Sequence, residues 1–328
     1  MSYQPPYIIN PKIIHLISAI SEQVGVVQRD FLDASPQLRR ANRIKTITGT
    51  LAIEGSTMSE DQVAALLEGK LVSASPRELA EVEGAIAAYE QLQQLDPFKL
   101  DDLRRAHQLM MGDLLPHAGR FRNKAVGVYQ DREVIHVAPP AHRVSGLMAD
   151  LFQWINQSEQ HPLITSTVFH YEFEFIHPFM DGNGRMGRLW QTLLLAQWKP
   201  LFFDLPLESV IKEHQQAYYQ ALGSADEAVE STLFIEFMLE AILQTLRKNA
   251  PVNAPANAPV NLHALKTTDA ILRLLDSNAH LTRKEMAAQI GKDVRTIGRA
   301  IKNLQDNGRL RRVGSAKTGH WEPIRTYD

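Results

Sequence analysis

The chain has 328 residues, of which 44% are hydrophobic and 22% are charged, so it has ample apolar material for a core and is not disordered throughout. It contains no cysteine, which excludes disulfides, thiolate zinc sites and thiol nucleophiles. Its first residues lack a signal-peptide pattern, and no stretch approaches the roughly 18 apolar residues of a membrane-spanning helix. We therefore expect a cytoplasmic protein without a membrane partner.

The net charge of −2 conceals two regions of opposite charge. Residues 262–328 carry 13 Lys/Arg and 7 Asp/Glu, whereas residues 1–261 carry 22 and 30. Between them, residues 249–260 read NAPVNAPANAPV, and proline at this spacing favours an extended spacer over a helix. The sequence thus predicts a linker over residues 249–261 and a separate basic domain over 262–328. The alternative is a surface loop within one domain.

Before the linker, apolar residues recur at spacings of three and four, which predicts helices packed on one another. The predicted helices are 76–92, 100–114, 140–158, 162–176, 183–198, 206–222 and 227–246. Residues 124–137 instead alternate between apolar and polar positions, which is typical of a β-hairpin. We therefore expect an all-α fold with one small hairpin.

After the linker, three short helices are predicted over 266–278, 282–291 and 293–307, followed by a hairpin over 310–321. Thr282 and Glu285 form a capping-box pattern at the start of the second helix. This order resembles a winged helix-turn-helix domain, with the polar residues Thr296, Arg299 and Lys302 on one side of the third helix. Such a domain binds either DNA or a protein, and the sequence leaves both possibilities open.

The twelve residues 177–188, HPFMDGNGRMGR, carry the chemistry. A glycine-rich loop that leads into a helix presents backbone N–H groups and a positive dipole end, which together form an anion site. Arg185 and Arg188 are three residues apart, so both guanidiniums project from one side of the helix start. Asp181 suits a Mg²⁺ ion bound beside phosphates, and the usual pKa of histidine, about 6.5, suits His177 to act as a general base.

These parts together describe a site for a nucleoside triphosphate with Mg²⁺. The Walker A pattern GxxxxGK[ST] is absent, and no predicted strand precedes the glycines, so P-loop and Rossmann sites are excluded. Taken singly, each residue has a simpler explanation: a helix end for His177, a turn for the glycines and surface charge for the arginines.

The segment also resembles the Fic-family signature HPFxDGNGRxxR at every fixed position, and the resemblance extends over about residues 100–246. It implies a Fic catalytic domain (98–248) that transfers AMP from ATP to a Ser, Thr or Tyr hydroxyl of a target protein. His177 would be the base, and Asp181 would hold Mg²⁺. Residues 124–137 would form the flap that binds the target segment by strand addition. The implied phosphate ligands are Gly182, Asn183, Gly184 and Arg185 for the α- and β-phosphates and Arg188 for the γ-phosphate.

The N-terminal helical region (1–97) contains a second motif of this family. Residues 50–55, TLAIEG, resemble the inhibitory motif (S/T)xxxE(G/N), whose glutamate pairs with the second signature arginine. The resemblance implies an autoinhibited enzyme in which Glu54 pairs with Arg188 and takes away the γ-phosphate ligand. The alternative is an ordinary helix end.

Four further residues have open interpretations. His170, Glu174 and His177 fall on one helix face, either as a metal site or, more simply, as packing and hydrogen-bonding groups. Tyr218 and Tyr219 fall where the family contacts adenine and ribose, although core packing explains them almost as well.

Alternative functions also remain open. One is removal of AMP from a modified protein at the same site, and another is transfer of UMP, phosphate or phosphocholine by the same fold. A third is nucleotide sensing by a DNA-binding regulator without turnover. Self-modification and a homodimer are further hypotheses about partners.

Overall fold

The computed structural model describes residues 3–32, 36–130, 133–249, 266–277, 281–313 and 320–323. The chain divides into two compact units, Met1–Val252 and Asn253–Asp328, each with its own apolar core. The predicted linker lies outside the described residues, apart from Asn249 at the end of the last helix of the first unit. Among the described residues, no helix is both long and apolar enough to cross a membrane.

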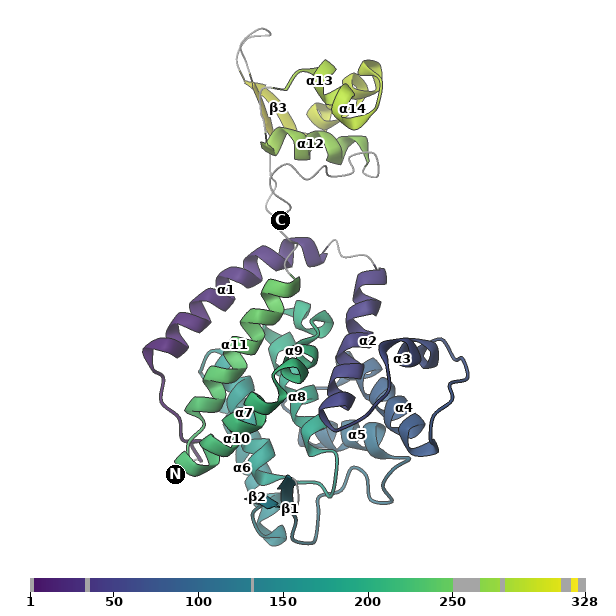
Figure 1. Ribbon diagram of the computed structural model, residues 1–328. Coiled ribbons are helices and arrows are strands. Elements are labelled where there is room, and N and C mark those ends of the chain that lie inside the picture. Colours follow the sequence, from purple (N-terminus) through teal and green to yellow (C-terminus); the bar gives the residue numbers. More distant parts are fainter. Residues whose placement is uncertain are drawn as a thin grey trace. The chain divides into compact units, whose positions relative to one another are not determined.

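The first unit is helical except for one two-stranded sheet (Figure 1). Its helices and 3₁₀ turns are α1 (Pro11–Leu32), α2 (Pro36–Ile53), α3 (Glu60–Leu67), α4 (Pro76–Glu90), η1 (Leu92–Gln94), α5 (Leu100–Met111), α6 (Ala141–Gln157), α7 (Pro162–Ile176), α8 (Asn183–Trp198), η2 (Pro200–Asp204), α9 (Leu207–Glu213), α10 (Gln215–Ala228) and α11 (Thr232–Asn249).

Helices α7 and α8 form the centre of this unit. They pack against each other, and both are buried on nearly every side, as expected of helices enclosed by others. Helices α6 and α11 pack on α7, while α2 and α5 pack on α8. The loop between α7 and α8, which is the segment 177–188, is therefore anchored at both ends in the core.

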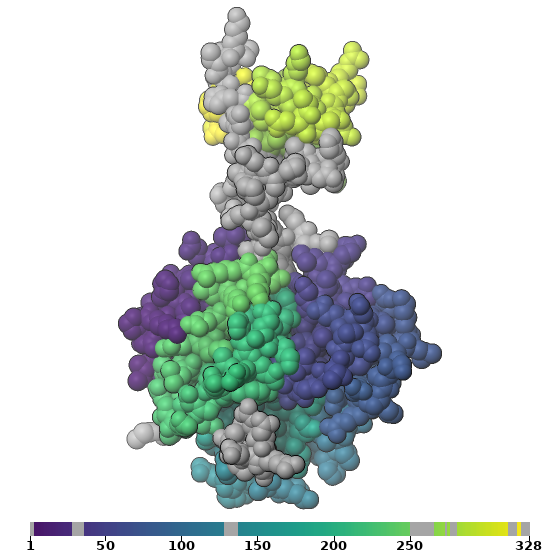
Figure 2. Space-filling view, in the orientation of Figure 1, coloured from purple at the N-terminus to yellow at the C-terminus, as the bar shows by residue number. Residues whose placement is uncertain are grey.

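Helices α1 and α2, from the N-terminal part of the chain, pack on helices that follow the centre in sequence. Helix α1 lies along α11, and the two form adjoining parts of the surface in the space-filling view (Figure 2). Helix α2 packs on α9, and a Cβ atom at Gly49 would lie only 2.9 Å from the backbone of Glu208. Glycine at this position thus permits the close approach that brings the end of α2, and the motif 50–55, against the centre.

Two predicted helices are bounded differently in the structure. The predicted helix 206–222 is interrupted at His214, which separates α9 from α10 with its backbone at φ −112° and ψ 30°. The predicted helix 227–246 begins later, because α10 continues to Ala228 and Val229 ends it in the left-handed region. The next helix starts at Thr232, after the Ser231 N–H donates to the Pro6 carbonyl. The local spacing of apolar residues marks neither boundary.

The predicted hairpin is present as β1 (Gly127–Gln130) paired antiparallel with β2 (Glu133–Val137). Its register shifts between Val128 and Tyr129, which marks a bulge. The turn between the strands lies outside the described residues.

The second unit has a winged helix-turn-helix fold. Its elements are α12 (Thr267–Ser277), α13 (Arg283–Ile290), α14 (Val294–Asp306), β3 (Leu310–Val313) and β4 (His320–Pro323). The predicted capping box is confirmed, since Thr282 and Glu285 each accept the other's backbone N–H. The fold class predicted from the sequence, a helical domain with a small hairpin followed by a winged helix, is confirmed.

Candidate active site

The loop 177–188 begins with a histidine in an uncommon backbone conformation. Helix α7 ends at Ile176, and His177 follows it in the left-handed region, with φ 49° and ψ 61°. The following proline predicted the helix end, but an extended conformation is the usual one before proline. A left-handed non-glycine residue persists where its surroundings hold it, so His177 is held in place by its neighbours.

Arg122 supplies that support. Its Nε donates to the His177 carbonyl at 2.7 Å, and its Nη2 donates to the Ile176 carbonyl at 3.2 Å. Its guanidinium also donates to the carbonyls of Lys124 at 2.9 Å and Pro139 at 2.5 Å, which flank the hairpin. The side chain is only 3% exposed. One buried arginine thus fixes the histidine and the base of the flap together.

His107 supports the middle of the loop. Its Nδ1 accepts the Gly119 N–H at 2.8 Å, so its Nε2 is left to donate to the Asp181 carbonyl at 3.0 Å. The ring stacks on Phe179, with 3.7 Å between ring centroids. Burial lowers the pKa of His107 to about 4, which keeps the ring neutral at pH 7. Neither Arg122 nor His107 could be identified from the sequence, because no motif marks a side chain that binds distant carbonyls.

The glycine-rich turn Gly182–Gly184, called the cradle below, lies at the start of α8, where the sequence predicts an anion site. Gly182 adopts φ 82° and precedes the helix, whose first backbone N–H groups have no partner within a helix. The Asn183 side chain closes the turn, since it accepts the Phe179 N–H at 2.9 Å and donates to the Phe179 carbonyl at 3.0 Å. The group that Asn183 offers to an anion is therefore its backbone N–H.

Two charged side chains flank this cradle. Arg185 is 4% exposed, and its Nε has no hydrogen-bond partner among the described residues. Its Nη2 lies 3.5 Å from Asp181 Oδ1, which also accepts the Gly182 N–H at 2.6 Å. The Asp181 side chain is 47% exposed and borders a cavity of about 400 Å³. A buried guanidinium nitrogen without a partner is a feature that a phosphate oxygen would satisfy.

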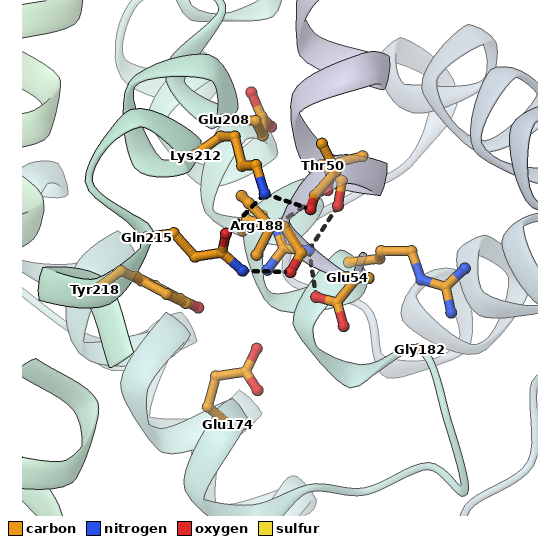
Figure 3. Close-up of polar contacts among 12 residues, drawn as sticks. Thr50, Glu54, Glu174, Gly182, Arg188, Glu208, Lys212, Gln215 and Tyr218 are labelled. Carbon is orange, nitrogen blue, oxygen red and sulfur yellow. Dashed lines mark hydrogen bonds and ion pairs between the residues drawn. The ribbon is translucent and has the colours of Figure 1, made fainter. Parts of the chain in front are cut away.

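Arg188, one turn further along α8, contacts the end of α2 (Figure 3). Its Nη2 donates to Glu54 Oε1 at 2.7 Å and to the Thr50 carbonyl at 3.1 Å, and its Nε donates to Thr50 Oγ1 at 3.0 Å. Burial alone would lower the pKa of Arg188, but the Glu54 carboxylate raises it above its usual range. The pair implied by the motif 50–55 is thus formed.

The Glu54 carboxylate also lies over the cradle itself. A Cβ atom at Gly184 would be 2.5 Å from Glu54 Oε1 and 3.1 Å from Arg188 Nη1. The carboxylate therefore fills the space above a residue that the sequence predicts as a phosphate ligand. The Glu54 side chain thus contacts Arg188 and also fills the space beside Gly184.

The remaining candidate residues lie behind this surface. His170 is fully buried between Gln191 (2.6 Å) and the Tyr218 hydroxyl (3.1 Å), and burial lowers its pKa to about 3. Within the described chain, no group of three His, Asp or Glu side chains is placed to hold a metal ion. Tyr218 is 1% exposed, whereas Tyr219 is half-buried and donates to the Ile53 carbonyl at 3.3 Å.

The fold and this loop define a helical domain with a glycine-rich turn at the start of α8, and a winged helix follows it in the chain. Residues 97–195 match the Fic/DOC family, and residues 266–311 match the family described as winged helix-turn-helix DNA-binding. A solved Fic family protein from Desulfovibrio desulfuricans G20 is 38% identical, with 99% of this chain and 100% of that chain covered and a TM-score of 0.72. The chain belongs to the Fic family.

Curated relatives include the protein adenylyltransferase Fic of Aedes aegypti, 31% identical over 211 residues that cover 60% of this chain and 40% of the relative. Protein adenylyltransferase fic-1 of Caenorhabditis elegans is 29% identical over 231 residues, which cover 63% of this chain and 44% of the relative. The chain thus spans less than half the length of these curated relatives. A solved fragment of the C. elegans protein (residues 134–508) shares the fold, with a TM-score of 0.59 at 23% identity and 73% and 70% of the two chains covered.

Proposed function

We propose that this protein is a protein adenylyltransferase that moves AMP from ATP to a Ser, Thr or Tyr hydroxyl of a protein. The observation that carries the proposal is the loop 177–188. This loop contains a histidine held by Arg122, a helix N-terminus and a buried arginine whose Nε has no partner among the described residues, which supports binding of phosphates beside a base. The names of the curated relatives support the same activity.

In this proposal, the hydroxyl oxygen attacks the α-phosphorus of ATP, and His177 takes its proton. The bond from the α-phosphorus to the oxygen that bridges to the β-phosphate breaks, and pyrophosphate leaves. The backbone N–H groups at Asn183 and Gly184, together with the Arg185 guanidinium, bind the phosphates. General base catalysis of this kind contributes about 10²–10⁴-fold to the rate.

The residues present fit a Mg²⁺ ion beside the phosphates. Mg²⁺ is usually held by one or two carboxylates, substrate phosphates and several waters. Asp181 offers an exposed carboxylate next to the cradle, one oxygen of which already accepts the Gly182 N–H. When bound, the ion would neutralise charge on the phosphates.

The hairpin 124–137 is proposed to hold the target segment. Arg122 ties the carbonyls on either side of the hairpin to the backbone of His177, so a strand added to the flap would be aligned with the base. The same geometry applies to a hydroxyl of a second copy of the chain, which would give self-modification. A homodimer remains a hypothesis.

Glu54 is proposed to restrain this activity. Its carboxylate occupies Arg188, the proposed γ-phosphate ligand, and lies against Gly184. ATP bound beside it would place its α-phosphate out of line with the attacking hydroxyl, and misplacement by about 1 Å can lower a rate by about 10²-fold. The Glu54→Gly variant is therefore expected to be more active than the wild type.

The test uses ATP labelled on either the α- or the γ-phosphate, with the wild type and the Glu54→Gly variant. We expect stronger labelling of protein by the variant with the α-label and none with the γ-label. Label from the γ-phosphate would indicate phosphate transfer and contradict the proposal. A chase of labelled protein with unlabelled ATP tests AMP removal, the alternative in which Glu54 orients the attacking water.

DNA binding by the second unit is a second candidate function, favoured by cations on α14. Arg295, Arg299 and Lys302 follow one another at spacings of four and three, are exposed, and form no ion pair within the described chain. In the wing, by contrast, Arg311 pairs with Glu322 and Arg312 stacks on Trp321. The helix is therefore the better candidate for contact with the anionic duplex.

The matched test for DNA binding compares two arginine variants. Arg299→Ala should weaken binding to duplex DNA and reduce its salt dependence, whereas Arg311→Ala should have a smaller effect. Equal binding by a chain that ends at Asn249 would contradict this function. It would also exclude the regulator alternative.

A further inference from the structure

The end of helix α2 has every terminal carbonyl occupied. An α-helix leaves its last four carbonyls without partners inside the helix. In α2 these belong to Thr50, Leu51, Ala52 and Ile53. Leu51 accepts the backbone N–H groups of Glu54 and Ser56, and Thr50 accepts from Arg188. The Ala52 carbonyl accepts the Gly55 N–H at 3.1 Å and also a side chain from outside the helix, whereas the Ile53 carbonyl accepts only from such side chains.

Those side chains come from the corner where α9 meets α10 (Figure 3). Lys212 Nζ donates to the Ala52 carbonyl at 2.8 Å. Gln215 Nε2 donates to the Ile53 carbonyl at 2.7 Å, and the Tyr219 hydroxyl donates to the same oxygen at 3.3 Å. Glu54 follows Ala52 and Ile53 directly in the chain. The hydrogen bonds from the corner therefore hold the backbone next to the Glu54 carboxylate.

The corner is arranged so that its two polar side chains act together. Lys212 also donates to Gln215 Oε1 at 2.7 Å. Because a lysine only donates, the amide oxygen must face it, which turns the Gln215 NH₂ toward the Ile53 carbonyl. The helix break at His214 brings the end of α9 and the start of α10 to the same place.

We propose that Lys212 and Gln215 are positioning residues that hold Glu54 on Arg188, so that the α9–α10 corner sets the strength of the restraint. This inference rests on the proposed function and on the inhibitory role of Glu54. A cation at a helix C-terminus stabilises the negative end of the helix dipole, and Lys212 occupies that position on α2. Without Lys212 and Gln215, the Ala52 carbonyl keeps only the Gly55 N–H and the Ile53 carbonyl keeps only the Tyr219 hydroxyl at 3.3 Å. The last turn of α2 then has fewer donors and frays more often. Glu54 then releases Arg188 more often.

The experiment compares the Lys212→Met/Gln215→Leu double variant with the wild type and with Glu54→Gly. Methionine and leucine keep much of the apolar bulk and remove the donors. A hydrogen bond of this kind is worth roughly a factor of 2–10, so we expect AMP labelling to rise by about 5- to 50-fold, up to the level of Glu54→Gly. Lys212→Arg, which keeps a charged donor, should retain most of the restraint.

Lys248→Met is the matched control. Lys248 lies on α11 and pairs with Glu213, the neighbour of Lys212 in the chain, so this variant removes a lysine from the same surface without touching α2. We expect it to behave as the wild type. In the Glu54→Gly background, the double variant should add nothing further, because the carboxylate that the corner positions is already absent.

Hydrogen exchange gives a readout independent of activity. The N–H groups of Glu54, Gly55 and Ser56 donate to carbonyls in the last turn of α2, and they should exchange faster in the double variant. If Glu54→Gly raises labelling but the double variant does not, the inference is wrong. If Glu54→Gly has no effect, the inhibitory role fails, and the exchange rates then decide whether the corner holds α2.

Discussion

The loop 177–188 and the end of α2 meet at Arg188 but are held in different ways. The loop is fixed by side chains that are almost fully buried, namely Arg122, His107 and Asn183. The end of α2 is held, apart from Arg188, by half-buried side chains of the α9–α10 corner. Buried polar contacts are costly to break, whereas half-exposed ones can be exchanged for water. We therefore expect the contacts that hold the loop to persist and the contacts that hold the end of α2 to break more easily.

The largest effect is expected from the loop itself. His177→Ala, made in the Glu54→Gly background, should lower AMP transfer by about 10²–10⁴-fold, because the attacking hydroxyl loses its proton acceptor. ATP affinity, measured by calorimetry, should remain close to that of Glu54→Gly. Transfer at an unchanged rate would remove His177 from the mechanism.

The support of the loop is expected to matter almost as much. In the same background, Arg122→Met removes donors to four backbone carbonyls and frees both His177 and the base of the flap. We expect transfer to fall by about 10²-fold, with a larger effect on kcat than on ATP binding, since misplaced groups slow the chemical step. Arg143→Met, an exposed position on α6, is the control. Equal kcat in both variants would contradict a positioning role.

The contact between α2 and α9, beside the end of α2, should make the stability of the protein depend on pH. Burial raises the pKa of Glu208 to about 7, and Tyr89 donates to its carboxyl at 2.8 Å. A raised folded-state pKa means that the contribution of this group to stability is present below about pH 4.5 and is lost as the pH rises through 7. Glu208→Gln should therefore gain stability relative to the wild type between pH 5 and pH 8.

The size of that gain is on the order of 1–3 kcal/mol. Urea unfolding at the two pH values measures it, and the exposed Glu227→Gln on α10 serves as the control. A difference between variant and wild type that is the same at both pH values would show that Glu208 is ionised throughout.

The smallest effect is expected from removing the second unit. Because the two units have separate cores, a chain that ends at Asn249 should stay folded and bind ATP as the full chain does. Thermal unfolding and calorimetry test this. If the shorter chain aggregates and the full-length chain does not, the two units depend on each other for folding.

Local sequence signals predicted the central helices well. Helices α7 and α8 have the predicted limits, because Pro162, Pro178 and the glycine-rich turn mark their ends within a clear apolar pattern. The resemblance of residues 50–55 to a known motif implied the contact between Glu54 and Arg188, which the structure contains.

The supports of the site could not be predicted in this way. Arg122 and His107 bind backbone carbonyls that lie 55 and 74 positions away in the chain. Every residue has a backbone carbonyl, so the residue types do not show which one is bound. The break at His214, which brings Lys212 and Gln215 to α2, involves neither proline nor glycine. These features depend on tertiary packing, which local spacing does not record.

The most direct measurement is the relative affinity for ATP and ADP, determined by calorimetry in the presence of Mg²⁺. If Glu54 occupies the γ-phosphate ligand Arg188, the wild type should bind both nucleotides similarly. Glu54→Gly should then favour ATP by about 10- to 100-fold, the value of a hydrogen bond to a charged group. The Glu54→Gly/Arg188→Ala variant should lose that preference. A wild type that already favours ATP as strongly as Glu54→Gly would contradict the account.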